Sequence, residues 1–165
     1  MSRKIISSFT SSLTVIFLLT LFLFGCERQK SSIADKPLPK EAFKAEISIK
    51  NPPSVLKIKS SAKVNVKIKN VSTHTWPARG QPDKTYQINL SYRWLDKEGK
   101  ILIRDGLRTP LPYDIKPDND IDLNATVAAP GNPGEYMLEF DMVQERVSWF
   151  KDRGSKTATV PVRVE

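Results

Sequence analysis

An all-β fold is the class that the sequence predicts for residues 43–165, and three features predict it. Apolar and polar residues alternate over most of this range, which is the pattern of strands that bury one face. Turns rich in Pro and Gly separate the alternating stretches, and no stretch keeps the period of an amphipathic helix. Short strands joined by such turns indicate an immunoglobulin-like β-sandwich of about 7–9 strands.

The expected strands follow from the alternation and its breaks. The first begins at Ile47 and is broken by Pro52 and Pro53, which suit an edge because proline donates no backbone hydrogen bond. The clearest alternation spans 62–68, where apolar residues face one way and mostly lysines the other. Segment 104–117 contains three prolines and is expected to be irregular. The other expected strands cover 55–58, 86–94, 101–103, 121–127, 136–142, 147–150 and 160–164.

Two aromatic residues have expected places in such a sandwich. Trp94 lies on a central strand and is expected to pack between the sheets, with a hydrophobic contribution of about 2–3 kcal/mol. Tyr136 follows Pro133 and Gly134 at the start of a late strand, which is the position of a tyrosine corner.

The first 25 residues have the pattern of a secretory signal peptide. Two basic residues near the start are followed by an apolar stretch from Val15 to Phe24. The ending, Leu23-Phe24-Gly25-Cys26, resembles the lipobox of bacterial lipoproteins, which implies a lipid on Cys26 and membrane attachment through it. The alternative is an uncleaved anchor, because the 21 residues before Cys26 carry no charge.

Either alternative places the folded part in the cell envelope, outside the cytoplasm. Glu27 follows the cysteine where a signal for inner-membrane retention would have Asp, so in a Gram-negative host we expect the periplasmic face of the outer membrane. Residues 26–42 carry charges and prolines without an apolar period, and they are expected to form a flexible tether. The sandwich domain then covers 43–165.

The charge distribution is uneven. Residues 27–69 contain 11 Lys or Arg against 4 Asp or Glu, and such a basic half could attract anionic lipid or acidic polysaccharide. The simpler interpretation is a solvated strand face whose lysines protect a sheet edge. No nucleic acid partner is expected.

The composition excludes several kinds of site. With one Cys and one His, the chain can form neither an internal disulfide nor a Cys/His zinc site. Asp118, Asp120 and Asp122 alternate, but the Gly and Glu of an EF-hand loop are missing from the required positions. We therefore expect a solvated strand face with no metal site and no cofactor, and the alternative is a loose calcium site at these aspartates.

No set of catalytic residues stands out. No hydroxyl or thiol nucleophile that could act together with His74 can be identified in the sequence. Asp141 and Glu145 could serve as paired carboxylates, but four residues on one strand separate them widely. The chain is therefore not expected to be an enzyme, and a hydrolase is a remote alternative.

The candidate ligand-binding residues are aromatic, charged and amide residues outside the strand alternation, because loops at a sandwich end commonly carry binding sites. Aromatic faces stack on sugars, and Arg, Gln and Glu form directed hydrogen bonds. The alternative is structural, with the aromatic pair plugging the sandwich end and the arginine holding the irregular segment. The candidates are Trp76, Arg104, Arg108, Tyr113, Gln144, Glu145, Trp149 and Phe150.

Several segments together resemble a known module. They are 89–94, 105–112, 129–136, 138–145 and 147–150, and in this order they look like the Ig-like module appended to bacterial glycosyltransferases and methyltransferases of surface-polysaccharide pathways. Residues 70–77 are also similar to the tryptophan-rich Ig-like domain of autophagy cargo receptors. The resemblance implies a non-catalytic accessory domain that contacts carbohydrate or protein.

These expectations combine into one functional hypothesis. The chain is expected to be a lipid-anchored module of the cell envelope that recognises surface polysaccharide. The alternative is a lipoprotein that binds or assembles an envelope protein through a strand edge or the lysine-rich face.

Overall fold

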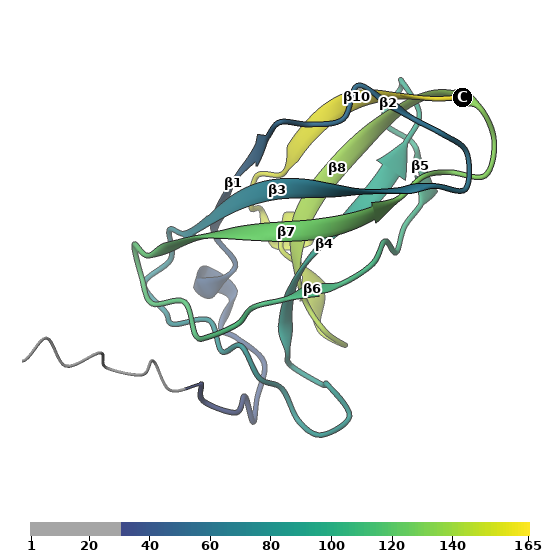
Figure 1. Cartoon of the computed structure of the whole chain (residues 1–165). Helices are drawn as coiled ribbons and strands as arrows, with labels where there is room; N and C mark the ends of the chain where they lie inside the picture. The colour runs from purple at the N-terminus through teal and green to yellow at the C-terminus, as the bar shows by residue number, and fades with distance from the viewer. Residues whose placement is uncertain (1–30) are drawn as a thin grey trace, which may run out of the picture.

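The computed structural model describes residues 31–165 and contains two stacked β-sheets (Figure 1). The expected signal peptide, Cys26 and the first residues of the expected tether lie outside the described residues. The smaller sheet has three antiparallel strands in the order β1-β3-β7. These strands span Ala45–Lys50 (β1), Ser61–Asn70 (β3) and Asp120–Ala128 (β7).

The larger sheet follows the order β2-β10-β8-β4-β5, with β6 paired to β4 and β9 paired to β8. Among the strands that form this sheet in residues 31–165, β2 and β10 pair in parallel and the other pairs are antiparallel. The bounds are Val55–Leu56 (β2), Ile88–Leu95 (β4), Ile101–Ile103 (β5), Thr109–Pro110 (β6), Gly134–Gln144 (β8), Ser148–Trp149 (β9) and Ala158–Val164 (β10). The prediction of an all-β, immunoglobulin-like sandwich is confirmed. The described residues form ten strands where 7–9 were expected. The number is higher because it includes three strands of only two residues each, β2, β6 and β9.

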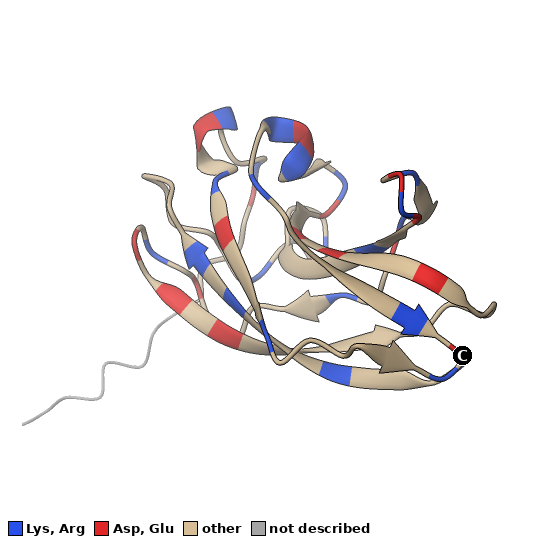
Figure 2. Ribbon diagram, turned by 90° about the horizontal axis from the view of Figure 1, so that it is seen from above, with Lys and Arg blue, Asp and Glu red and all other residues tan. Residues whose placement is uncertain are grey.

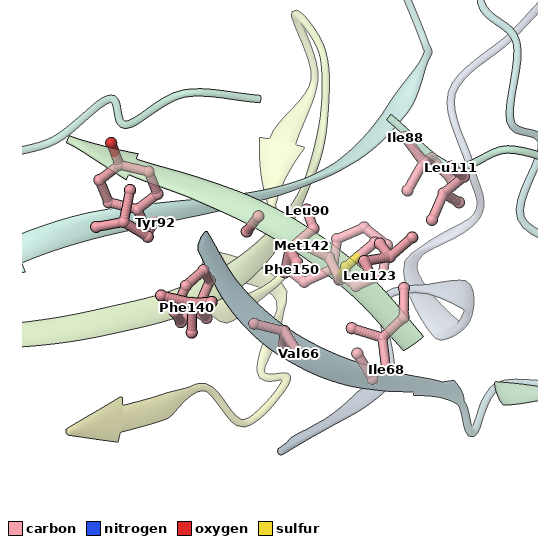
Figure 3. Close-up of a cluster of buried hydrophobic side chains, with 14 of the residues drawn as sticks. Val66, Ile68, Ile88, Leu90, Tyr92, Leu111, Leu123, Phe140, Met142 and Phe150 are labelled. Carbon is pink, nitrogen blue, oxygen red and sulfur yellow. The ribbon is translucent and has the colours of Figure 1, made fainter. Parts of the chain in front are cut away.

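The core lies between the two sheets, and its residues follow the predicted alternation. Every second residue of β3, from Val64 to Ile68, is buried and faces the apolar side of β4 and β8. Figure 3 shows side chains of both sheets pointing towards one another, among them Val66, Leu90 and Phe140. This burial is the main driving force for the sandwich.

Both aromatic expectations are confirmed. Trp94 is fully buried, and its indole N–H donates to the Ala128 carbonyl at 3.0 Å, which ties the larger sheet to β7. The Tyr136 hydroxyl donates to the Asn132 carbonyl at 3.0 Å, four residues earlier, as in a tyrosine corner.

Three lysines on the outer side of the smaller sheet are paired with carboxylates of β7 or the residues just before it, while Lys63 donates to the Thr126 hydroxyl. Lys50 meets Asp122 at 2.9 Å, and Lys67 meets Asp120 at 2.9 Å. Figure 2 shows basic and acidic segments side by side on neighbouring strands of this sheet. Because these pairs are exposed, each contributes about 0–1 kcal/mol. The sheet is therefore a charge-balanced solvated face, and its aspartates are engaged by lysines.

The structure differs from the prediction in the segment expected to be a flexible tether. Residues 31–42, which we call the N-terminal strap, lie on the sandwich and end in a short 3₁₀ helix, η1 (Lys40–Ala42). The backbone N–H and the hydroxyl of Ser32 both donate to Asp114, at 2.8 and 2.6 Å. The Leu38 N–H donates to Gln144 at 3.0 Å, and the Ala42 carbonyl accepts from the Trp76 indole at 2.9 Å.

The strap escaped prediction because its attachment uses mainly backbone groups. Such contacts leave no apolar period in the sequence, so prolines and charges between them resemble a linker. Residues 31–42, expected to belong to the tether, are therefore part of the folded domain in the structure.

Candidate functional site

A polar hollow of about 360 Å³ lies at one end of the larger sheet. It is lined by Asp83, Lys84, Gln87, Asn89, Arg108, Pro110, Glu145 and Arg146, and we call it the polar hollow. Four segments supply these residues: the loop before β4, the start of β4, the β6 segment and the turn between β8 and β9. Of the eight predicted candidates, Arg108 and Glu145 line it.

Strand register brings these segments together. Asn89 on β4 lies opposite Val143 of β8 on one side and Pro110 of β6 on the other. The loop before β4 is then tied to the β8–β9 turn, because the Tyr86 N–H donates to the Glu145 carbonyl and the Glu145 N–H donates to the Gln87 carbonyl, at 3.1 and 2.9 Å. The walls of the polar hollow are therefore fixed by backbone hydrogen bonds.

Arg108 is held by four hydrogen bonds within the protein. Its Nε donates to Glu145 at 2.8 Å, and its Nη2 donates to Asp105 at 3.0 Å. Its Nη1 donates to the Ser91 hydroxyl and the Gly106 carbonyl, both at 3.0 Å. Arg108 thus fixes the irregular segment against β4, which is the structural role considered from the sequence, while one edge of it borders the polar hollow.

Glu145 is oriented by two donors. Its Oε1 accepts from Arg108 and from the Asn89 amide, at 2.8 Å each. The Asn89 Oδ1 accepts in turn from the Gln87 amide at 3.3 Å. Among the described residues, Oε2 of Glu145 makes no hydrogen bond, so this oxygen remains available as an acceptor at the polar hollow.

Trp149 lies beside this site and is covered by cations. The Arg93 guanidinium carbon is 3.9 Å from the centroid of its ring, and that of Arg108 is 5.1 Å away. Only 8% of Trp149 is exposed. Because its ring is occupied by guanidinium groups, Trp149 does not present a face for stacking on a ligand.

Three other candidates are also buried, which corrects their expected role in ligand binding. Trp76 and Phe150 pack edge to face at 5.1 Å in an aromatic cluster with Phe43. Gln144 points inward, where it accepts from the Leu38 N–H of the strap and donates to the Tyr86 carbonyl. These residues close the end of the sandwich, as in the structural alternative.

The remaining candidates lie away from the polar hollow. Arg104 is exposed on the segment after β5, and Tyr113 is partly buried against the core. Conversely, sequence reasoning missed Gln87 and Asn89, which line the polar hollow. Both are polar residues at the outward positions of the alternating run 86–94. The sequence feature that could have indicated them is this polar strand face next to a loop.

A row of charged residues is buried on the outer side of β4 and β8. Arg93 lies 3.2 Å from Glu139 and 3.6 Å from Asp141. Burial would raise the pKa of Glu139, but hydrogen bonds from Lys151 and Thr157 outweigh burial and hold that pKa below its usual range. Burial raises the pKa of Asp141 to about 6, although the Lys151 and Met142 N–H groups and Arg93 oppose this. Asp141 is thus buried in an ion cluster, whereas Glu145 lines the polar hollow, and the two do not share a cleft.

The pKa of Asp141 leads to a testable pH dependence. Between about pH 4 and 6 the folded chain keeps a proton that the unfolded chain has released, so the contribution of Asp141 to the free energy of unfolding falls as the pH rises, by at most about 3 kcal/mol. Asp141→Asn removes this titration. The free energy of unfolding of the variant should therefore rise relative to that of the original chain as the pH increases over the same range. Urea unfolding at pH 4, 5, 6 and 7 measures the difference. A constant difference across these pH values would contradict the assignment.

Three of the six non-glycine residues with positive φ among the described residues lie in or next to the lining of the polar hollow. Lys84, Tyr86 and Arg146 have φ angles of 67°, 67° and 63°, in the left-handed region. Each such residue costs about 1–2 kcal/mol when it is not glycine. Residues strained in this way are common at functional sites.

Two features are absent from residues 31–165. In this range no helix is long and apolar enough to cross a membrane. The same range contains no group of three or more His, Cys, Asp or Glu side chains placed to hold a metal ion.

Comparison with known proteins gives distant similarities to solved structures. No family model and no curated protein matches the chain. A β-glucosidase mutant from Listeria innocua in complex with laminaribiose has a TM-score of 0.47 and 11% identity, over 74% of this chain and only 16% of the glucosidase. The CARDB domain of PF1109 from Pyrococcus furiosus has a TM-score of 0.43 and 17% identity, over 73% of this chain and 93% of that domain. AvmM, which catalyses macrocyclization in alchivemycin A biosynthesis, has a TM-score of 0.45 and 9% identity, over 82% of this chain and 94% of AvmM.

Proposed function

We propose that this protein is a non-catalytic, lipid-anchored module of the cell envelope that binds a saccharide in the polar hollow. The observation that carries the proposal is the open hollow of about 360 Å³, whose lining combines amides, carboxylates and cations on fixed backbone segments. Sugar hydroxyl groups both donate and accept hydrogen bonds, so they require a lining of this mixed kind.

The rigidity of the site supports binding. Arg108 is held by four hydrogen bonds, and Glu145 is held by Arg108 and Asn89. Glu145 and Asn89 therefore lose little side-chain entropy when a ligand forms hydrogen bonds to them, which lowers the entropic cost of binding. Lys84 and Arg146 add exposed cations at the rim.

The anchoring part of the proposal rests on the sequence before residue 31. The signal-like segment 1–25 and its ending at Cys26 support a lipid on this cysteine. Lipid attachment would keep the module at the periplasmic face of the outer membrane in a Gram-negative host. A module of this kind would act by binding.

A second candidate function is the binding of an envelope protein, and the exposed edge at β5 favours it. Leu102, Ile103 and Leu107 are 49%, 40% and 50% exposed on or just after this edge strand. An open strand edge with apolar side chains can accept a strand from a partner.

Glycan binding by residues 31–165 tests the first proposal. The fragment keeps the strap and is applied to a glycan array at low and high salt, and binding that persists at high salt is expected. Gln87→Ala should raise the dissociation constant for the best saccharide about tenfold, because the polar hollow loses one amide. Asn132→Ala is the matched control, since it removes an exposed amide near the start of β8, at the other end of that strand from the polar hollow.

Two results would count against saccharide binding in the polar hollow. One is an array on which no saccharide retains the protein. This result would favour the second candidate function, the binding of a protein partner at the β5 edge. The other is a Gln87→Ala variant that binds as tightly as the original chain, which would move the binding site elsewhere.

A further inference from the structure

The N-terminal strap and the polar hollow are neighbours. A smaller hollow of about 240 Å³ lies beside the first, and Gln87 lines both of them. Ile33 of the strap forms part of the wall of this smaller hollow, together with Arg79. Figure 1 shows the start of the strap and the loop before β4 at the end of the sandwich opposite the C-terminus.

The strap is fixed at this place. The Ala34 N–H donates to the Arg79 carbonyl at 2.8 Å, and the Ala34 carbonyl accepts from the Gln81 amide at 2.7 Å. Ser32 is held by its two hydrogen bonds to Asp114. The entry point of the chain into the domain is therefore set by the fold.

The distance from this entry point to Cys26 is limited by covalent geometry. Five residues lie between Cys26 and Ser32, and the six Cα-to-Cα steps that join them span at most about 22 Å when fully extended. In contrast, β4 leads away from the polar hollow, and its last residue, Leu95, lies seven residues after Ile88, or about 23 Å further on. Because the described chain starts at the end of the sandwich that holds the polar hollow (Figure 1), a short connection to a lipid on Cys26 favours an orientation in which this end faces the membrane.

We infer that the polar hollow lies at the membrane-proximal end of the domain and that its ligand is the saccharide headgroup of a glycolipid in the membrane that carries the lipid anchor. This inference rests on the proposed function, because it requires both the lipid on Cys26 and saccharide binding. It adds the orientation of the module and the class of its ligand.

Attachment to the same membrane changes the affinity that this ligand needs. Once the protein is anchored, binding of a headgroup in the same bilayer is an intramolecular event with a high effective concentration. A long flexible tether would dilute this effect, whereas the docked strap keeps the connection short. A polymer far from the membrane would lie outside the reach of the polar hollow.

Energy transfer from the protein to the bilayer tests the orientation. The chain has one cysteine, so Lys84→Cys places a single donor dye at the polar hollow when Cys26 carries lipid. Lys97→Cys places the same dye on the exposed β4–β5 turn as a matched control. Each full-length lipidated variant is reconstituted in vesicles of phosphatidylethanolamine and phosphatidylglycerol that contain an acceptor on the lipid headgroup.

The Lys84→Cys dye should transfer more efficiently than the Lys97→Cys dye. A Gly/Ser spacer of about 12 residues between Lys30 and Ser31 adds roughly 20 Å of flexible chain and should reduce this difference. Equal transfer from both dyes without the spacer would overturn the orientation.

Binding to a lipid-linked saccharide tests the ligand class. The full-length lipidated protein is placed in the same vesicles with rough lipopolysaccharide as the probe, and the released core oligosaccharide serves as the soluble competitor. The apparent affinity for the lipid-linked form should be about 100-fold higher than for the soluble form. An equal affinity for both forms would overturn the inference.

These outcomes are separable from failure of the proposed function. If Cys26 carries no lipid, or if residues 31–165 bind no saccharide, the proposed function fails and this inference fails with it. If lipidation and saccharide binding are both found, equal energy transfer or equal affinity removes the inference alone.

Discussion

Deletion of the N-terminal strap is expected to lower the free energy of unfolding by roughly 6 kcal/mol, because six hydrogen bonds of about 1 kcal/mol each are lost. Among these, the Trp76 indole N–H loses its acceptor and Asp114 loses both of its bonds to Ser32. Comparison of residues 31–165 with residues 43–165 in urea unfolding measures the effect.

Side-chain changes on the strap provide the matched control. Asp35 and Lys36 are exposed, and the attachment of the strap uses other groups, so the double variant Asp35→Ala, Lys36→Ala should unfold within about 0.5 kcal/mol of the original fragment. If residues 43–165 were as stable as residues 31–165, the strap would not belong to the folded domain.

The second large effect is expected from Arg93→Ala, which should destabilise the domain by about 3–5 kcal/mol because Glu139 and Asp141 remain buried without their shared cation. The variant also removes the guanidinium that lies 3.9 Å from the centroid of the Trp149 ring. Thermal and urea unfolding at pH 7 measure the loss.

The effect of Arg93→Ala should depend on pH. At pH 5 Asp141 is largely protonated, since burial raises its pKa to about 6, so less charge is left unpaired and the loss of stability should be smaller than at pH 7. Arg163→Ala, which removes an exposed partner of Glu165, is the control and should change stability by less than about 1 kcal/mol. A loss equally small for Arg93→Ala would contradict the role of the buried ion cluster.

The sequence predicted the elements whose two faces differ in polarity. β3 alternates between buried apolar residues and solvated lysines, so its position and orientation follow from the period alone. Trp94 and Tyr136 were also placed correctly, because each occupies a position at which β-sandwiches of this type commonly have a large aromatic residue.

The sequence did not predict features that depend on contacts distant in the chain. Arg93, Glu139 and Asp141 stand at the polar positions of β4 and β8, yet they are buried because Trp149 and the residues after it fold over them. Alternation alone cannot distinguish such a covered face from a solvated one.

The candidate site was predicted only in part for the same reason. Arg108 and Glu145 were identified from their residue types, while Gln87 and Asn89 were assigned to an ordinary strand face. Trp76 and Phe150 resembled ligand platforms because they stand outside the alternation, but they close the core at the end of the sandwich.

The most direct test of saccharide binding in the polar hollow is an NMR titration of ¹⁵N-labelled residues 31–165 with the best saccharide from the array. The largest shifts are expected for the backbone amides of Gln87, Asn89 and Glu145, with little change on the β1-β3-β7 sheet. Shifts confined to that sheet or to the β5 edge would contradict the proposed site.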